Sequence, residues 1–202
     1  KEWICYIPGI VKGIAFALQC FTQPGDKVII QPPVYHPFRL TPEGNRREVV
    51  MNPLIMHEDG SYSMDFDNLA EVADEKCRLL ILSNPHNPAG ITWDAETLRR
   101  LADFCSERNI IVISDEIHCE LTLHDNQYTP FGSLPDNLSY GSITCCSPSK
   151  AFNIAGLQIA NIICRAALVR ERIDRAININ EVCDVNPFGV EALQVAYTDG
   201  GA

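Results

Sequence analysis

Short, continuous apolar runs alternate along the chain with segments in which apolar residues recur at helical spacing. Such runs predict strands that are buried on both faces, because a strand with one solvated face alternates apolar and polar residues instead. The amphipathic segments between them predict helices. The predicted strands are residues 27–31, 46–51, 79–82, 110–114, 142–146 and 158–164. The predicted helices are residues 10–21, 65–73, 95–108 and 168–178. This alternation predicts an α/β protein whose sheet is covered on both sides.

Polar residues follow three of the predicted strands at the point where each strand ends. The segment Asn84-Pro85-His86-Asn87-Pro88-Ala89-Gly90 follows the strand at 79–82, and Asp115 follows the strand at 110–114. Ser147-Pro148-Ser149-Lys150 follows the strand at 142–146. Open α/β sheets bind their ligands in a crevice at the carboxyl ends of the strands. The sequence therefore predicts a ligand site built from these three segments.

Composition and charge narrow the class of partner. The 202 residues suit one large α/β domain, or one domain with part of another, and 46% hydrophobic residues are enough for a sizeable core. Sixteen basic and 26 acidic residues give a net charge of −10, which argues against nucleic acid and anionic membranes as partners. No apolar stretch approaches the roughly 20 residues that span a bilayer, and no signal peptide opens the chain.

Nine cysteines lie mostly within apolar runs, and none forms a Cys-x-x-Cys pair. An odd number without that spacing is poor support for a disulfide framework or a zinc site. We predict buried free thiols and a cytoplasmic location, where thiols stay reduced. The five histidines show no metal-ligand spacing, and we predict no metal.

Lys150 is the most informative residue of the predicted site. A lysine after a strand is ordinarily a solvated surface group, but here Ser147 and Ser149 offer hydroxyls to a phosphate, and partial burial would lower the pKa of the amine. Asp115 is either a turn cap or an acid that keeps a pyridine nitrogen protonated. Glu116 beside it is predicted to be structural. A lysine with an acid and an amide suggests Schiff-base chemistry on pyridoxal phosphate.

Three further positions have two interpretations each, and one further segment is a candidate phosphate site. Asn87 is either turn chemistry or a partner for the cofactor's ring hydroxyl. His118 either reaches the same ring edge or is a core histidine. Tyr35 either stacks on a flat ring or packs under its own loop. Gly9-Ile10-Val11, at a helix start, offers backbone amides to a phosphate, although one glycine is weak support by itself.

Together these segments resemble the aminotransferase class I/II family of fold-type I pyridoxal-phosphate enzymes, and most of all its cystathionine β-lyase-like branch of C–S lyases. The resemblance follows the family order through nearly the whole chain and implies a three-layer α/β/α large domain with a mostly parallel, mixed central sheet. It is carried by Pro32-Pro33-Val34-Tyr35-His36-Pro37-Phe38, Ser83-Asn84-Pro85-His86-Asn87-Pro88-Ala89-Gly90, Ser114-Asp115-Glu116-Ile117-His118 and Ser147-Pro148-Ser149-Lys150-Ala151-Phe152-Asn153-Ile154-Ala155-Gly156-Leu157.

The resemblance also implies roles for single residues. Lys150 would form the Schiff base with the cofactor and later move the Cα proton. Asp115 would hold the pyridine nitrogen and Asn87 the ring hydroxyl, while Tyr35 would stack on the ring.

At the phosphate, the resemblance implies contacts from Ile10, Val11 and Ser147. Typical transaminases of the family carry an arginine eight residues after the lysine, whereas Gln158 occupies that position here. His118 stands where many of them carry tyrosine. Both departures favour the C–S lyase branch, and the phosphate is then expected to depend on hydroxyls, backbone amides and a partner subunit.

The chain begins at Lys1 without methionine and stops at Ala202 just beyond a helix-like segment, so both ends look cut. By the resemblance, residues 1–202 are the cofactor-binding large domain, without the N-terminal arm and most or all of the C-terminal small domain. The arginine that clamps the substrate carboxylate would lie in that small domain. A homodimer with a shared active site is expected.

These observations predict a pyridoxal-phosphate C–S β-lyase that converts sulfur amino acids to pyruvate, ammonia and a thiol by α,β-elimination. An aminotransferase using the same residues is the first alternative. The second alternative belongs to another class, a catalytically inert module or fragment that only binds pyridoxal phosphate.

Overall fold

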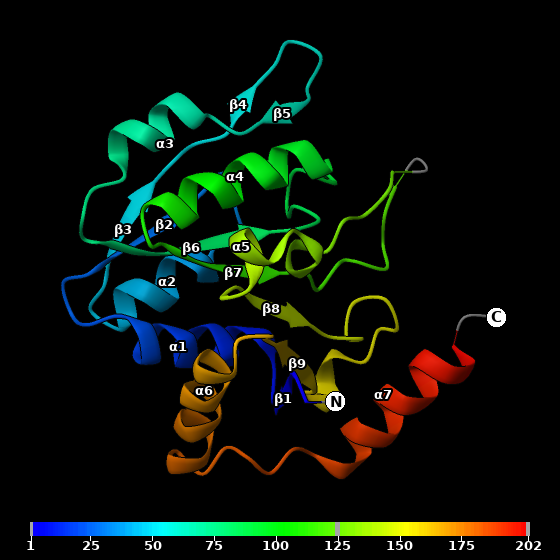
Figure 1. Cartoon of the computed structure of the whole chain (residues 1–202). Helices are drawn as coiled ribbons and strands as arrows, with labels where there is room; N and C mark the ends of the chain where they lie inside the picture. The colour runs from blue at the N-terminus through cyan, green and yellow to red at the C-terminus, as the bar shows by residue number, and fades with distance from the viewer. Residues whose placement is uncertain (1, 124–125, 201–202) are drawn as a thin grey trace.

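A seven-stranded mixed sheet runs through the centre of the chain in the order β1-β9-β8-β7-β6-β2-β3 (Figure 1). The computed structural model describes residues 2–123 and 126–200. Strands β3, β2, β6, β7 and β8 are parallel, whereas β9 is antiparallel to both β8 and β1. The strands are β1 (Ile4–Ile7), β2 (Lys27–Ile30), β3 (Glu48–Met51), β6 (Cys77–Ser83), β7 (Ile111–Asp115), β8 (Ile143–Cys146) and β9 (Ala160–Ile163). A separate hairpin pairs β4 (Ile55–Met56) with β5 (Tyr62–Ser63).

Helices cover both faces of the sheet, which gives three layers (Figure 1). One face carries α1 (Ile10–Phe21), α2 (Pro37–Gly44) and α6 (Ala167–Ile179). The opposite face carries α3 (Phe66–Val72), α4 (Ala95–Glu107) and α5 (Asp136–Ser139). Helix α7 (Pro187–Asp199) lies outside these layers and contacts the short 3-10 helix η2 (Ala155–Leu157), while the 3-10 helix η1 (Phe131–Ser133) lies near β8.

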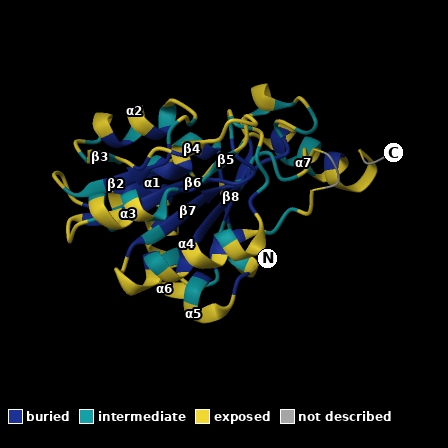
Figure 2. Ribbon diagram, turned by 90° about the horizontal axis from the view of Figure 1, so that it is seen from above, coloured by how far each residue is buried: buried dark blue, intermediate teal, exposed yellow. Residues whose placement is uncertain are grey.

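The central strands bury side chains on both faces. In β6, Leu79 and Ile81 belong to the core beneath α1, whereas Leu80 and Leu82 belong to the core beneath α4. Figure 2 shows the buried strands lying between helices whose outer faces are exposed. This double burial explains the continuous apolar runs, since neither face of β6 needs a polar residue.

Most predicted elements are confirmed, with shifts of a few residues at their ends. Helix α1 has the predicted bounds, and α4 begins after Asp94, whose carboxylate accepts a hydrogen bond from the Thr97 N–H at 2.7 Å. Strands β1, β4 and β5 and helices α2 and α5 were not predicted. Helix α2 has Pro37 in its first turn and Pro42 inside it, and this proline density is typical of a loop rather than a helix.

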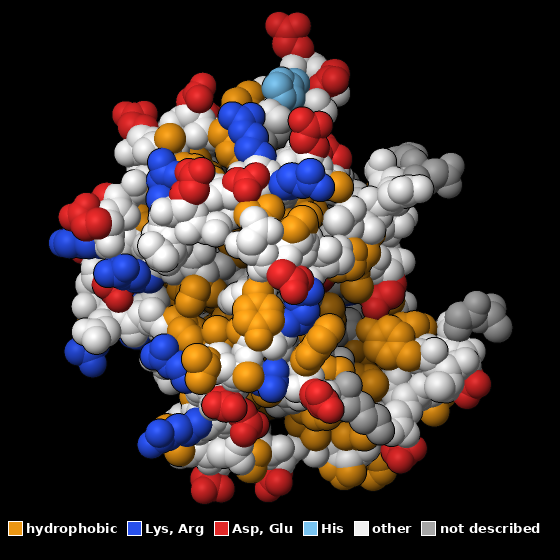
Figure 3. Space-filling view, viewed as in Figure 1, with side chains coloured by type: hydrophobic (Ala, Val, Ile, Leu, Met, Phe, Trp, Pro, Cys, Tyr) orange, Lys and Arg blue, Asp and Glu red, His pale blue; other side chains and the backbone are white. Residues whose placement is uncertain are grey.

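All nine cysteines are free thiols, and five of them are buried. Across residues 2–123 and 126–200, no helix is long and apolar enough to cross a membrane. The same residues contain no group of three or more His, Cys, Asp or Glu that could hold a metal ion. Acidic and basic side chains are interspersed over the face drawn in Figure 3, around a band of apolar side chains.

The packed core makes a testable prediction at Ile113 of β7, which is 0% exposed. Ile113→Ala leaves a cavity beneath α1 and is expected to lower the free energy of unfolding by about 2–5 kcal/mol. The matched control is Ile55→Ala in the hairpin, where the side chain is 42% exposed and the loss should stay within about 1 kcal/mol. Urea titrations measure both values, and equal losses would contradict the assigned core.

Candidate active site

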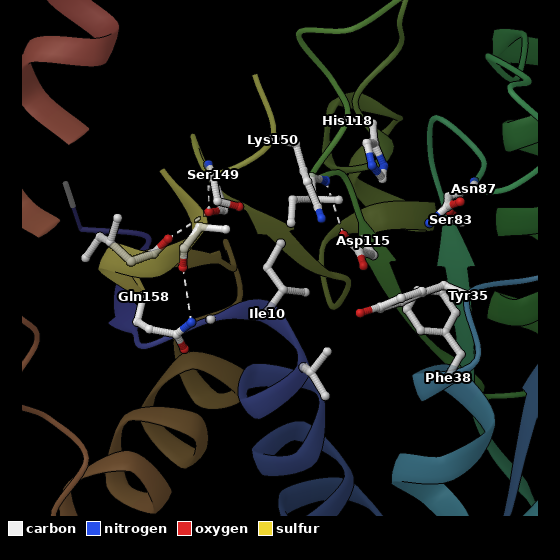
Figure 4. A pocket seen from close by; sticks show the side chains of 16 residues that line it. Ile10, Tyr35, Phe38, Ser83, Asn87, Asp115, His118, Ser149, Lys150 and Gln158 are labelled. Carbon is white, nitrogen blue, oxygen red and sulfur yellow. Dashed lines mark hydrogen bonds between the residues drawn. The ribbon is translucent and has the colours of Figure 1, made fainter. Parts of the chain in front are cut away.

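The carboxyl ends of β6, β7 and β8 meet at one edge of the sheet and open into a cavity of about 170 Å³ (Figure 4). The strand register places Ser83 beside Asp115, and Asp115 beside Cys145. All the site residues selected from the sequence line this cavity, so the structure brings them together, although their roles stay predictions. They are Ile10, Val11, Tyr35, Asn87, Asp115, His118, Ser147 and Lys150.

Lys150 follows β8 and reaches into the cavity on the side of Asp115 and His118 (Figure 4). Its side chain is exposed, whereas the sequence analysis considered a partly buried amine. The ammonium instead acts on its neighbours, because its charge contributes to lowering the pKa values of Asp115 and His118.

Asp115 lies at the buried end of the cavity, with a side chain held by a hydrogen bond from the Ile117 N–H to its Oδ1 at 3.1 Å. The pKa of the Asp115 carboxyl is raised to about 7, mainly by burial and also by the neighbouring charge of Glu116, although the Ile117 N–H and the charge of Lys150 act to lower it. A cationic partner stabilises the ionised form of such a buried carboxyl strongly. The site therefore fits a ligand whose inner end carries a protonated nitrogen.

Glu116 is also buried, but its carboxylate is fully engaged within the protein. Its Oε1 accepts hydrogen bonds from Ser114 Oγ at 2.7 Å and from the Phe131 N–H at 2.9 Å. The Tyr128 hydroxyl donates to Oε2. These contacts tie the segment around residues 128–131 to β7 and support the structural role predicted for Glu116.

The opposite end of the cavity is formed by the N-terminus of α1. Gly9 caps this helix with φ of 106°, a backbone conformation that favours glycine, and it has no side chain that could accept from the first N–H groups. The first N–H groups of an α-helix lack an acceptor four residues earlier, which leaves those of Ile10 and Val11 available to an anion. This end therefore suits a phosphate.

Ser147 and Ser149 lie beside this helix end but differ in what their hydroxyls do. Ser147 Oγ donates to the Ile159 carbonyl at 2.7 Å and accepts from the Ser149 N–H at 3.2 Å. The single hydroxyl hydrogen of Ser147 is therefore used within the protein, and the donation to phosphate expected of it does not fit this conformation. The Ser149 hydroxyl also lines the cavity and is the better donor.

One wall of the cavity is aromatic and rests on a buried anchor. The Tyr35 ring packs edge-on against Phe38, with centroids 6.0 Å apart, and Phe38 is 1% exposed. Asn87 lies nearby, where its backbone N–H donates to Ser83 Oγ at 3.0 Å and fixes the loop after β6.

The His118 side chain also lines the cavity. Burial lowers the pKa of His118, and the charge of Lys150 lowers it further, so the imidazole is neutral at pH 7.

Sequence reasoning missed two residues of this wall. Phe38 lies within the segment that carries the family resemblance, but nothing in its pattern shows that it supports Tyr35. Ser83 ends β6, and its position at a strand end was the available signal. Gln158 lines the cavity as well, at the position where the sequence had already shown a departure.

Solved structures share this fold across nearly the whole chain. A PLP-bound putative aminotransferase from Clostridium difficile 630 has a TM-score of 0.96 at 34% identity, covering 99% of this chain and 51% of that chain. Cystalysin from Treponema denticola, whose structure contains pyridoxal 5′-phosphate, has a TM-score of 0.95 at 32% identity. This match covers 99% of the present chain and 51% of the cystalysin chain. The fold is that of the fold-type I pyridoxal-phosphate enzymes, as the sequence predicted.

The sequence comparisons define the family. The profile of aminotransferase class I and II matches residues 1–182, and the chain belongs to that family. It is 44% identical over 201 residues to a Bacillus subtilis (strain 168) protein named cystathionine beta-lyase PatB, a match that covers 99% of this chain and 52% of that protein. The chain thus spans about half the length of this curated relative. The resemblance stated from the sequence is confirmed.

Asp115 makes a prediction about stability in protein freed of bound cofactor. Since its pKa in the folded state, about 7, lies above the ordinary 3.8, the folded state binds this proton more tightly. The resulting stabilisation is present at low pH and is lost as the pH rises toward 7. Asp115→Asn has no carboxyl to titrate and does not lose this stabilisation. The free energy of unfolding of the variant minus that of wild type should therefore rise by about 3 kcal/mol between about pH 4.5 and about pH 7.5.

Urea titrations at the two pH values measure this difference. Asp103→Asn is the matched control, since Asp103 is an exposed acid on α4. The same change in both variants would show that the effect does not come from the buried carboxyl at the end of β7.

Proposed function

We propose that the chain binds pyridoxal 5′-phosphate and is the cofactor-binding large domain, over residues 1–202, of a carbon–sulfur β-lyase. The observation that carries the proposal is the buried Asp115 carboxyl, which shares one cavity with Lys150 and the N-terminus of α1. The cavity thus offers an acid, an amine and a set of backbone amides to one ligand. The 44% identity with a protein named cystathionine beta-lyase PatB supports the choice of reaction.

Each part of the cavity has a partner on this cofactor. Asp115 would pair with the pyridine nitrogen, and Asn87 would donate to the ring hydroxyl, with neutral His118 at the same edge. Tyr35, supported by Phe38, would cover one face of the ring.

At the far end, the N–H groups of Ile10 and Val11 and the Ser149 hydroxyl would bind the phosphate. Ser147 would contribute by holding Ser149 in place, since it accepts from the Ser149 N–H.

When bound, pyridoxal phosphate supplies an aldehyde for amines and a protonated ring that withdraws electrons from the substrate Cα. Lys150 would provide the amine for this aldehyde, and its exposed side chain would leave it free to move when a substrate amine takes its place. Lys150 would then take the proton from the substrate Cα as a general base. Asp115 would hold the proton on the ring nitrogen throughout.

The products follow from this proton transfer. Once the Cα proton had moved to Lys150, the Cβ–S bond would break and the sulfur would leave as a thiolate with the bonding electrons. Hydrolysis of the remaining three-carbon unit would give pyruvate and ammonia. The substrate class is therefore amino acids with sulfur at Cβ, such as cystathionine or cysteine S-conjugates.

An aminotransferase is the second candidate, favoured by the structural likeness to a putative aminotransferase from Clostridium difficile 630. In that reaction Lys150 would take the same proton and return it to a carbon of the cofactor. The two reactions share their first step and differ in whether a leaving group departs, so their products distinguish them.

The assembly and location are proposals too. We propose a homodimer that shares its active site, which the family resemblance supports. Nine free cysteines support a cytoplasmic location, because reducing compartments keep thiols unpaired. A third outcome, binding of cofactor without turnover, would assign the chain to inert cofactor-binding modules.

The cofactor proposal predicts that Lys150 is the point of attachment. Pyridoxal phosphate added to the intact protein carrying this sequence, followed by borohydride reduction and peptide mapping, should label the Lys150 peptide. Lys150→Ala should lose the near-visible absorbance band and the label, whereas Lys76→Ala, at an exposed lysine, should keep both. Labelling that survives Lys150→Ala would assign the attachment to another amine.

The reaction proposal predicts pyruvate and a thiol from cystathionine without any added keto acid. Lys150→Ala should lower this rate at least about a thousandfold, because it removes both the attachment point and the base. Coupled assays for pyruvate and free thiol measure the products. Amino transfer that requires a keto acid and releases no thiol would support the aminotransferase, and bound cofactor without either reaction would support the inert module.

A further inference from the structure

Lys12, in the first turn of α1, lies beside the anion-binding end of the cavity through its contact with Gln158. Its Nζ donates to Gln158 Oε1 at 2.9 Å and to the Pro8 carbonyl at 2.8 Å. Gln158 lines the cavity, and a Cβ added to Gly9 would lie 3.6 Å from the same Oε1. The Gln158 side chain therefore lies against the residue that caps α1, with the Lys12 ammonium on its oxygen.

The Gln158 amide has its orientation fixed by these contacts. Its oxygen accepts from Lys12, and its Nε2 donates to the Ala155 carbonyl at 3.1 Å. An amide nitrogen carries two hydrogens, so one N–H has no acceptor among the described residues. Gln158 therefore has a spare donor beside the cavity that it lines (Figure 4).

The position of Lys12 is electrostatically unfavourable in the absence of an anion. The N-terminus of a helix carries a partial positive charge, which a lysine in the first turn increases. The first turn of α1 contains no acidic residue, and none of the ion pairs among the described residues includes Lys12. Both acceptors of the ammonium are neutral. An anion bound at this helix end would remove the imbalance.

We propose that Lys12 supplies the positive charge for the cofactor phosphate, and that Gln158 is the positioning residue that holds this ammonium at the helix end. The inference rests on the proposed binding of pyridoxal phosphate. It adds a cation to the N–H groups of Ile10 and Val11 and the Ser149 hydroxyl, which are already assigned to the phosphate. Lys12 is exposed, so its contribution is expected to weaken as salt concentration rises.

The test compares pyridoxal phosphate with pyridoxal, which lacks the phosphate, on the intact protein carrying this sequence. Lys12→Met should weaken the binding of pyridoxal phosphate about tenfold and leave the binding of pyridoxal unchanged. Its affinity for pyridoxal phosphate should also depend less on salt than that of wild type. Lys76→Met is the matched control, and absorbance titrations measure the dissociation constants.

Two further variants test the positioning role. Gln158→Ala should weaken pyridoxal phosphate binding selectively, because the ammonium loses its acceptor beside Gly9. The double variant Lys12→Met/Gln158→Arg should recover affinity for pyridoxal phosphate, since an arginine at position 158 places a cation directly at the cavity. A purely structural role for Gln158 would weaken pyridoxal to the same extent.

The outcomes separate this inference from the proposed function. Tight binding of pyridoxal phosphate with Lys150 labelled, but with no effect of Lys12→Met, would overturn the role of Lys12 and leave the proposed function intact. Failure of wild type to bind pyridoxal phosphate would overturn both. Selective loss in Lys12→Met, with recovery in the double variant, is the expected result.

Discussion

The register of β6, β7 and β8 is the constraint on which the site depends. Alternate residues of β6 and β7 belong to two different cores, and Ile143 and Cys145 of β8 belong to the core beneath α1, so a shift of one residue would exchange the faces of every side chain. The packing of both cores therefore fixes where each strand ends. Those ends place Ser83 beside Asp115 and bring the turn after β8 to the same edge. The site is thus positioned by residues that never contact it.

Charge is separated along the cavity in a way that suits a ligand with two unlike ends. Asp115 provides a buried acid at one end, and the N-terminus of α1 provides backbone amides at the other. Lys150 lies between them and lowers the pKa of Asp115 without overcoming the effect of burial. A cofactor with a protonated ring nitrogen and a phosphate matches both ends, which is the physical basis of the proposed function. Lys12, at the N-terminus of α1, adds positive charge to the end of the cavity that lies opposite Asp115.

The sequence predicted the parts of this arrangement that depend on local pattern. Asp115 and Lys150 follow apolar strands, and parallel strands end at one edge, so their proximity could be predicted without coordinates. The exposure of Lys150 and the internal hydrogen bond of Ser147 could not be predicted in this way, because both depend on how the turn after β8 packs. The contact between Lys12 and Gln158 joins positions 146 apart in sequence. It forms because β1 pairs with antiparallel β9 so that Ile7 lies opposite Ala160, which brings the start of α1 next to the residues just before β9. The direction of β9 was not readable from its apolar pattern.

The adjacent acids Asp115 and Glu116 show how the fold divides one chemical type between two purposes. Successive residues at a strand end point to opposite sides, so two neighbouring carboxylates enter different surroundings. Burial raises the pKa of both. Glu116 receives donors from Ser114, Tyr128 and Phe131, which offset its burial and fix the neighbouring segment. Among the described residues, the Asp115 carboxylate receives a hydrogen bond only from the Ile117 N–H, and it lines the cavity with its remaining capacity. Their adjacent positions in the sequence do not distinguish the two acids, whereas the number of hydrogen-bond donors around each carboxylate does. Asp115 is therefore the acid whose carboxylate is left to pair with a ligand.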